Sequence, residues 1–292
     1  MKISTLVSTA IFSCLASSGS TSAETIYGLT SVNSLIRFDS ANPGVINSNV
    51  AVSGLSAGQS LRGIDFRPAD RNLYGISSDS RLYVINTSTG AASAIGASGQ
   101  FTLSGTSFGF DFNPTVDRIR VTSELDQNLR LNPVNGALAA TDGTLAYAVG
   151  DANAGANPSI VGSAYTNSFS GATTTTLYNI DSVLDTLVTQ VPPNNGTLNT
   201  VGSLGFNTGN DVGFDITPFF NVAFASLTGT GGTSGLFNIN LATGAATSLG
   251  AIGNGLVIRD IAVQVPEPEM AALIMVGLFG LIASRRQSRR TL

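Results

Sequence analysis

The stretch Gly63-Ile64-Asp65-Phe66-Arg67-Pro68 decides the fold, because the chain repeats its pattern twice more. The copies are Gly109-Phe110-Asp111-Phe112-Asn113-Pro114 and Gly213-Phe214-Asp215-Ile216-Thr217-Pro218, so the shared form is Gly-apolar-Asp-apolar-x-Pro. The three aspartates are separated by 46 residues and then by 104 residues, which is about two further periods. A fixed period of this length indicates a protein built from structural repeats.

A second motif keeps the same phase. It is a short apolar run ending in Asn or Asp, and it occurs at residues 35–39, 82–86, 128–132, 177–181 and 236–240. Asp65 to Asn86 spans 21 residues, and so does Asp111 to Asn132. Both faces of the run 82–85 are apolar, which predicts a sheet that is covered on both sides.

Each repeat contains four short predicted strands. In the second repeat we expect them at residues 63–66, 72–77, 81–86 and 92–95. The turn between the last two runs from Asn86 to Gly90, and the same spacing recurs at 132–136 and 240–244, so we expect a positive φ at the final glycine. Four strands in about 47 residues are typical of a β-propeller blade.

The first repeat lacks its Gly-apolar-Asp strand. Thr25-Ile26-Tyr27-Gly28 corresponds to Asn72-Leu73-Tyr74-Gly75, and the missing strand is predicted at residues 257–263, which include Asp260. The sequence thus predicts an all-β, β-propeller-like domain over residues 24–264, with about five four-stranded blades and closure by the C-terminal strand. The fourth repeat is irregular, since its strand at 160–165 lacks the Asp and follows a long loop. An open β-sandwich or a solenoid is the alternative fold.

The N-terminus has the features of a secretory signal peptide over residues 1–23. Lys2 supplies the positive start, an apolar and small-residue stretch follows, and small residues lead up to Ala23. We therefore predict that signal peptidase cleaves between Ala23 and Glu24. A buried N-terminal helix and a lipoprotein modified at Cys14 are the alternatives.

The C-terminal residues 265–292 combine Pro266-Glu267-Pro268, the uncharged apolar stretch 270–284, and a cluster of four arginines: Arg285, Arg286, Arg289 and Arg290. Fifteen helical residues reach roughly 22 Å, less than the ~30 Å of bilayer hydrocarbon, but arginine snorkelling and local thinning let such a segment span. The arginines would then stay on the cytoplasmic side. The tail resembles the PEP-CTERM sorting signal of Gram-negative bacteria, which implies removal by an exosortase. A plain tail anchor is the alternative.

Composition excludes several classes of function. The chain has no His and no Trp, its single Lys is Lys2, and its single Cys is Cys14. These absences exclude a Ser-His-Asp triad, a His-ligated metal, a Schiff-base lysine and a disulfide framework. Leaving out Lys2, the four tail arginines, Glu267 and Glu269 changes the formal net charge from −4 to −7 for residues 24–264. An acidic domain without basic runs argues against nucleic acid as a partner.

Asp65, Asp111 and Asp215 are the polar residues that recur at matched positions. If their strands are innermost, the three side chains ring the central channel, where they would hold a hard cation such as calcium. The structural interpretation is that each aspartate accepts backbone N–H bonds and locks its blade. We favour the structural role, and hence no cofactor, with calcium as the alternative. Further calcium candidates lie in the predicted long loops: Asp142, Asp151 and Asp211.

Two further features accompany the repeated Gly-apolar-Asp-Phe-x-Pro motif. They are the loop from Asp151-Ala152-Asn153 to Pro158, and Ala164-Tyr165-Thr166-Asn167 with Thr173-Thr174-Thr175-Thr176-Leu177-Tyr178. Together, the three features resemble a bacterial extracytoplasmic family known as domain of unknown function 4394. The resemblance covers nearly all of residues 24–264. It implies the fold and a location outside the cytoplasm, but it brings no activity.

We therefore expect a non-enzymatic protein of the cell envelope or extracellular matrix whose propeller binds a polysaccharide or protein partner. The alternative is a carboxylate-based hydrolase or lyase that acts on an extracellular glycan or lactone. Two carboxyl groups ~5–10 Å apart in an open cleft would favour the enzyme, whereas carboxylates tied to backbone amides would favour binding or scaffolding. We expect anchoring in the inner membrane before processing, and then the outer envelope or the exterior as the final location.

Overall fold

The computed structural model of the chain describes residues 23–265. Most of the predicted signal peptide, the Pro266-Glu267-Pro268 motif, the apolar stretch 270–284 and the tail arginines therefore lie outside the described residues. Within the described part, no helix is long and apolar enough to cross a membrane.

Five antiparallel sheets form the described part of the chain, and we number them as blades 1 to 5. The strands of each blade are given from the innermost to the outermost. Blade 1 contains β21 (Ile258–Val263), β1 (Thr25–Thr30), β2 (Ser34–Asp39) and β3 (Asn42–Ala51); blade 2 contains β4 (Leu61–Phe66), β5 (Leu73–Ser77), β6 (Arg81–Ile85) and β7 (Ala92–Ile95). Blade 3 contains β8 (Phe108–Asn113), β9 (Arg118–Ser123), β10 (Asn128–Leu131) and β11 (Leu138–Thr141). Blade 4 contains β13 (Ile160–Tyr165), β14 (Leu177–Asp181), β15 (Thr186–Gln190), β16 (Thr197–Ser203) and β12 (Ala146–Tyr147), with the short 3-10 helix η1 (Pro193–Asn195) between β15 and β16. Blade 5 contains β17 (Val212–Ile216), β18 (Ala223–Thr228), β19 (Ser234–Ile239) and β20 (Ala246–Ala251).

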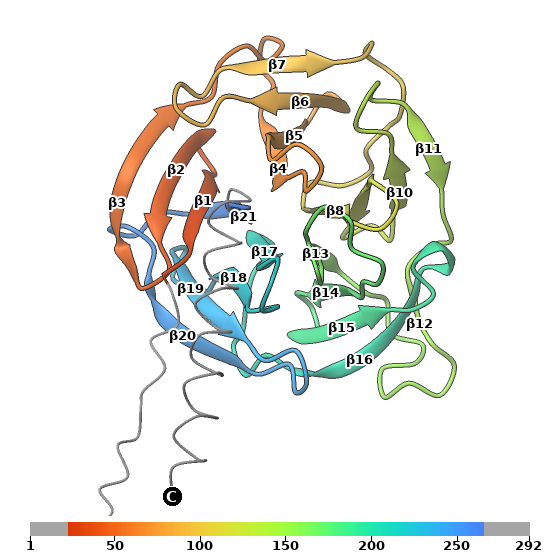
Figure 1. Cartoon of the computed structure of the whole chain (residues 1–292). Coiled ribbons are helices and arrows are strands. Elements are labelled where there is room, and N and C mark those ends of the chain that lie inside the picture. Colours follow the sequence, from red (N-terminus) through yellow and green to blue (C-terminus); the bar gives the residue numbers. More distant parts are fainter. Residues whose placement is uncertain (1–22, 266–292) are drawn as a thin grey trace, which may run out of the picture.

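The blades are arranged in a ring, so the predicted five-bladed propeller is confirmed (Figure 1). The innermost strands β4, β8, β13, β17 and β21 surround the central axis, and each contacts its neighbours in the adjacent blades. Blade 4 departs from the four-stranded pattern because the two-residue strand β12 pairs in parallel with β16. The apolar runs are buried on both faces, since each sheet is packed between two others.

The predicted closure is present. The last described strand, β21, pairs antiparallel with the first strand, β1, with Ile26 opposite Val263 and Gly28 opposite Ile261. Blade 1 is thus assembled from both ends of the described chain, and Figure 1 shows the red and blue strands side by side. Because β21 pairs with the inner side of β1, β1 is not left as an open edge of its sheet.

The turn between the third and fourth strands has the predicted geometry. Asn86 Oδ1 accepts the backbone N–H groups of Ser88 and Thr89 at 2.9 and 3.0 Å, and Gly90 has a φ of 74°. Gly136 and Gly244 have φ values of 72° and 82° at the equivalent positions. A Cβ atom at Gly90 would also clash with the carbonyl oxygen of Ala51 in blade 1, so this turn packs directly on the preceding blade.

Candidate functional site

The three repeated aspartates meet at the axis of the ring. Asp65 lies on β4, Asp111 on β8 and Asp215 on β17, and each offers a carboxylate oxygen within 4.8 Å of the others. Their exposed fractions are 3%, 1% and 4%. The sequence pattern produces this cluster because the same position on three innermost strands faces the same narrow channel.

Backbone amides of neighbouring blades bind these carboxylates. Asp65 accepts the N–H of Phe112 in blade 3 at 2.9 Å, and Asp111 accepts the N–H of Tyr165 in blade 4 at 3.2 Å. Asp215 accepts the N–H of Val263 in blade 1 at 2.5 Å. Each aspartate therefore links its own blade to an adjacent one. This is the locking role favoured by the sequence, with the donor on the neighbouring blade rather than in a turn.

A fourth aspartate joins the axis in a shifted register. Ala262 pairs with Tyr27 as Asp65 pairs with Tyr74, so Ala262 occupies the repeated Asp position and Asp260 lies two residues earlier. Two residues along a strand return to the same face, and Asp260 still accepts the N–H of Ile64 in blade 2 at 2.8 Å. The glycine of the motif makes room for this carboxylate, since a Cβ on Gly63 would lie 3.2 Å from Asp260 Oδ2.

Burial dominates the electrostatics of this cluster. It raises the pKa of Asp65, Asp111 and Asp260 well above the usual value, and the neighbouring carboxyls raise it further. Burial also raises the pKa of Asp215 to about 7, against the opposing effect of backbone hydrogen bonds from Val263 and Ile216. Proton sharing thus lets several carboxyls coexist at the axis.

The axial cluster has the oxygen chemistry that a hard cation requires, but several of its oxygens already accept amide protons. Both oxygens of Asp65 accept a backbone N–H, from Phe66 and Phe112, and those of Asp215 do so from Ile216 and Val263. Such a donor set favours a structural role over a calcium site. No other group of three or more acidic, His or Cys side chains in residues 23–265 has metal-binding spacing.

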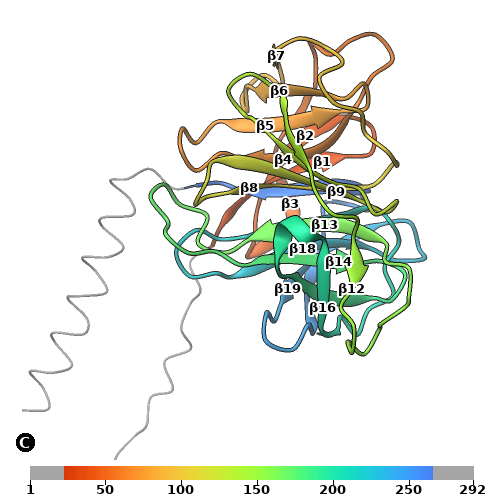
Figure 2. The ribbon, with the colours of Figure 1, turned by 90° about the vertical axis from the view of Figure 1, so that its right-hand side faces the viewer.

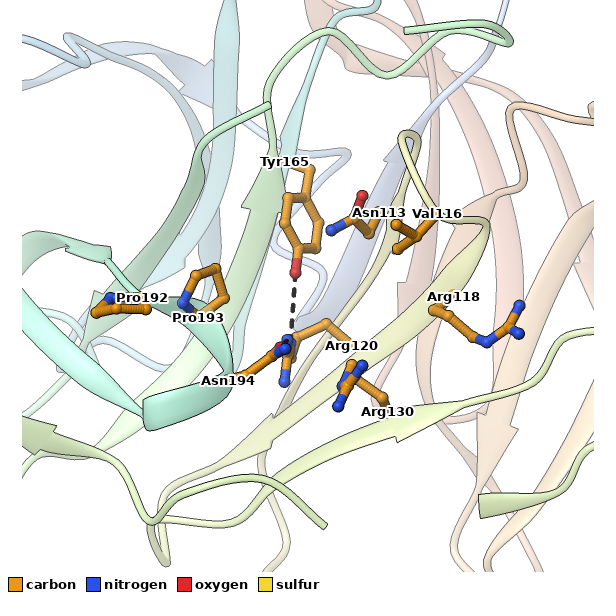
Figure 3. Close-up of a pocket in the computed structure, with 9 residues that line it drawn as sticks. All are labelled: Asn113, Val116, Arg118, Arg120, Arg130, Tyr165, Pro192, Pro193 and Asn194. Carbon is orange, nitrogen blue, oxygen red and sulfur yellow. Dashed lines mark hydrogen bonds between the residues drawn. The ribbon is translucent and has the colours of Figure 1, made fainter. Parts of the chain in front are cut away.

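A second polar cluster lies between blades 3 and 4, around a cavity of about 230 Å³ (Figure 3). Blade 3 contributes three arginines, and blade 4 contributes a tyrosine and the turn that contains η1. We call this cavity the arginine pocket; its lining residues are Asn113, Val116, Arg118, Arg120, Arg130, Tyr165, Pro192, Pro193 and Asn194. None of these nine residues is acidic.

Arg120 lies at the base of the arginine pocket and is only 2% exposed. Its Nε donates to Tyr165 Oη at 3.3 Å, and its Nη2 donates to Asn194 Oδ1 at 2.8 Å (Figure 3). Its Nη1 donates to Asn128 Oδ1 and Asp142 Oδ2 at 2.7 and 2.6 Å. Arg120 therefore links blade 3 to blade 4, and its side chain also lines the cavity.

The arginine pocket has an excess of positive charge. Arg130 also donates to Asp142, from Nε at 2.7 Å and Nη2 at 2.9 Å, so one carboxylate serves two guanidinium groups. Burial raises the pKa of Asp142, but the hydrogen bonds from Arg130 and Arg120 outweigh burial and leave this pKa below its usual value. Arg118 donates to the carbonyl oxygen of Asp117 at 2.8 Å. Arg120 and Arg130 thus share one carboxylate, Asp142, and Arg118 is bound to a neutral carbonyl oxygen, so the three guanidinium groups outnumber the carboxylates that they bind.

Sequence reasoning did not single out the arginine pocket, although the repeat contains a signal for it. Arg120 pairs with Asp111 on the second strand of blade 3. The same register position is aromatic in the other four blades: Tyr27, Tyr74, Tyr178 and Phe224. At this position blade 3 alone has a charged side chain, and the other four blades have an aromatic side chain that packs in the sheet interface.

The remaining candidates are dispersed. Asp142 is held by the two arginines, and Asp151 accepts from the backbone N–H and the hydroxyl of Thr200 at 2.7 and 2.6 Å. Neither belongs to a metal-spaced group with Asp211. Three tyrosines of the repeats, Tyr27, Tyr74 and Tyr83, are buried, and Tyr178 packs partly buried against the core cluster of blades 4 and 5.

Comparison with known proteins gives structural neighbours of low similarity. A protein of unknown function from Bacteroides thetaiotaomicron is 15% identical, with a TM-score of 0.48, over 83% of this chain and 64% of that one. A nidogen/laminin complex gives 12% identity and a TM-score of 0.45, over 83% and 98%. A dihydro-heme d1 dehydrogenase gives 12% and 0.38, and the match spans 77% of this chain but only 43% of the dehydrogenase. No curated protein was found to match.

A family model gives the assignment. The model of the domain of unknown function DUF4394 matches residues 34–262, which include part or all of every blade. The match extends from β2 to β21, so it covers both the axial aspartates and the arginine pocket. The chain belongs to the DUF4394 family.

Proposed function

We propose that this protein is an exported, non-enzymatic binding propeller, and that its arginine pocket holds an anionic group of an extracellular glycan. The observation that carries the proposal is a cavity lined by Arg118, Arg120 and Arg130 and by no acidic residue. Guanidinium groups bind carboxylates and sulfates through paired, charge-assisted hydrogen bonds. A volume of about 230 Å³ is below the roughly 300–1,000 Å³ of typical ligand pockets, which suits a single acidic sugar unit.

The positions of the carboxylates support binding over hydrolysis. A carboxylate-based hydrolase needs two carboxyl groups at an open cleft, so that one can transfer a proton and the other can act on the sugar. The axial aspartates are at most 4% exposed and accept backbone N–H groups. The one carboxylate that contacts the pocket arginines, Asp142, is bound by both Arg120 and Arg130.

Titration of the full chain in detergent with galacturonate oligomers, followed by calorimetry, tests the binding proposal. We expect saturable binding that weakens as salt is added, and no binding of neutral glucose oligomers. Arg118→Gln should weaken the binding about tenfold to a hundredfold, because a hydrogen bond to a charged group contributes about 1.5–3 kcal/mol.

Arg37→Gln is the matched control. It removes the same charge from an exposed position on β2 in blade 1, remote from the arginine pocket. Equal binding of acidic and neutral oligomers, or equal losses in the two variants, would contradict the proposal.

The export route is the second part of the proposal. The order Pro266-Glu267-Pro268, apolar 270–284 and four arginines supports a stage in which the tail halts in the inner membrane with the propeller outside the cytoplasm. An exosortase then removes the tail, and the mature form remains in the envelope or is released. Extended backbone around the prolines is accessible to a membrane protease.

Changing Pro266, Glu267 and Pro268 to Ala should leave translocation intact and block processing, so that the full-length form accumulates in the inner membrane. The measurement is the mass of the C-terminal peptide in native cells that contain an exosortase. A mature wild-type protein that still carries residues 265–292 would contradict removal of the tail and would favour a plain tail anchor.

A further inference from the structure

One end of the propeller exposes aromatic side chains. We call it the exit face: the end of the ring at which the innermost strands finish, from which the β13–β14 loop (166–176) and the β17–β18 loop (217–222) extend. Phe219 and Phe220 in the second loop are 39% and 54% exposed. Among residues 23–265 they are the only aromatic members of the exposed large hydrophobic residues.

The structure holds these rings at the surface. Phe219 stacks on Phe169 of the β13–β14 loop, with ring centroids 5.6 Å apart and an interplanar angle of 17°. Next to the rings, Asn221 Oδ1 accepts the N–H of Asn167 at 2.8 Å, and Asn221 Nδ2 donates to Asn167 Oδ1 at 3.1 Å. Two neighbouring blades thus fix an aromatic cluster that neither of them buries.

The two loops that carry the cluster are uncharged. Neither 166–176 nor 217–222 contains an Asp, Glu, Lys or Arg, although the domain as a whole is acidic. Their exposed polar residues are Ser170, Thr173 and Thr174. Uncharged loops with projecting phenylalanines have the chemistry of segments that lie in a membrane interface.

The chain leaves the propeller on this same face. β21 ends at Val263, and the N–H of Val263 donates to Asp215 on β17. Asp215 precedes Phe219 by only four residues, so the end of β21 lies near the β17–β18 loop. Figure 2 shows the green β13–β14 loop projecting on the left, the end of the ring towards which the described chain finishes. Only residues 266–269 separate the described chain from the uncharged stretch 270–284 in the sequence, and the five steps from 265 to 270 reach at most about 18 Å.

We propose that the exit face rests on the outer surface of the bilayer that receives residues 270–284, with Phe219 and Phe220 inserted among the lipid headgroups. This inference rests on the proposed membrane stage of the full chain. Two contacts then hold the propeller: the tail, which spans, and the phenylalanine cluster, which lies in the interface. The arrangement fixes the orientation of the ring and keeps residues 265–269 between the propeller and the bilayer.

The absence of Trp makes the proposal testable with a single fluorophore. The full chain carrying Phe220→Trp is reconstituted into phosphatidylcholine–phosphatidylglycerol vesicles, and quenching by lipids brominated at shallow positions is measured. Val183→Trp is the matched control, because Val183 is 67% exposed in the β14–β15 turn, at the opposite end of blade 4. We expect a blue-shifted, strongly quenched emission for F220W and little quenching for V183W.

The outcomes distinguish the proposed contact of the exit face with the bilayer from the proposed membrane stage of the tail. Flotation of the vesicles reports whether the full chain is bound to the membrane, so a chain that does not float contradicts the proposed membrane stage. A chain that floats with F220W unquenched, or with V183W quenched as strongly, overturns the proposed orientation. Emission of F220W that responds to added polysaccharide but not to brominated lipid would assign the cluster to a sugar and also overturn the proposal. Unchanged thermal unfolding of both variants confirms that the fold is intact.

Discussion

The axial aspartates and the arginine pocket are both buried charged clusters between blades, but they differ in how the charge is neutralised. At the axis, carboxyl groups face one another, accept backbone N–H bonds and have raised pKa values. In the arginine pocket, guanidinium groups share Asp142, whose pKa is lowered. The first cluster reduces its charge by binding protons, whereas the second keeps its charge.

The difference helps to distinguish residues that support the fold of a repeat protein from residues that could form a binding site. A residue that recurs in several blades and is bound by backbone amides supports the architecture that all blades share. Arg120 occurs once, at a position where the other blades have an aromatic ring, and its neighbours line a cavity. In this chain the residue that departs from the repeat, Arg120, therefore marks the candidate binding site, whereas the repeated carboxylates do not.

The largest effect is expected for Arg120→Met. Removing one member of a buried, hydrogen-bonded charge pair destabilises proteins by about 3–5 kcal/mol, because the partner is left without compensation. Here Asp142 keeps Arg130, so we expect the lower end of that range, measured as the free energy of unfolding in urea. Arg118→Gln should change stability by less than about 0.5 kcal/mol. Similar losses in the two variants would contradict the distinction between Arg120, which holds the two blades together, and Arg118, which lines the pocket.

A smaller loss is expected for Asp65→Ala. The change leaves the N–H groups of Phe66 and Phe112 without their acceptor in a buried place, and each unsatisfied group costs about 1–3 kcal/mol. Relief of repulsion among the axial carboxyls offsets part of this loss, so we expect about 2 kcal/mol in urea unfolding. Asp65→Asn retains one acceptor oxygen and should lose less. An alanine variant as stable as the wild type would show that the carboxylate does not lock the blades.

The pH dependence should have opposite signs in the two clusters. The folded-state pKa of Asp215, about 7, exceeds its unfolded value near 3.8, so the folded protein retains a proton that the unfolded chain releases between these values. The free energy of unfolding should therefore decrease as pH rises from about 4 to 7, and Asp215→Asn should reduce this decrease. Asp142 contributes the reverse, a loss of stability as pH falls below its unfolded value. Urea unfolding between pH 3 and 8 measures both.

Calcium should have the smallest effect. Because the oxygens of Asp65 and Asp215 already accept backbone N–H groups, we expect millimolar calcium to leave the melting temperature of the full chain unchanged. Magnesium at the same concentration controls for ionic strength. A rise in melting temperature with calcium that Asp111→Asn abolishes would restore the metal-binding interpretation of the axis.

The repeat made much of the architecture predictable. The in-phase motifs predicted five blades, the closing strand at residues 257–263 and the positive φ of Gly90, because these follow from local spacing and turn chemistry. The shifted register of Asp260 was not predicted. It depends on space that Gly63 of another blade provides, about 200 residues away in the sequence.

The arginine pocket was missed for a similar reason. Arg120, Tyr165 and Asn194 come from three separate segments, and no spacing in the sequence indicates that η1 folds back on blade 3. Asn194 also lies in a turn that departs from the Asn-to-Gly pattern of blades 2, 3 and 5. Aligning the repeats by strand register, rather than by their shared motifs, would have exposed the exceptional arginine.

The pairing of β1 with β21 sets the order of events during folding. Residues 25–30 emerge early in synthesis, but their inner partner, residues 258–263, comes last among the described strands. Blades 2 to 5 each consist of consecutive strands and can form as they emerge, whereas blade 1 must wait until residues 258–263 have been made. Such distant pairing is slow to form. Until then the ring is an open arc with an unpaired edge, and the final six-residue strand converts it into a closed molecule.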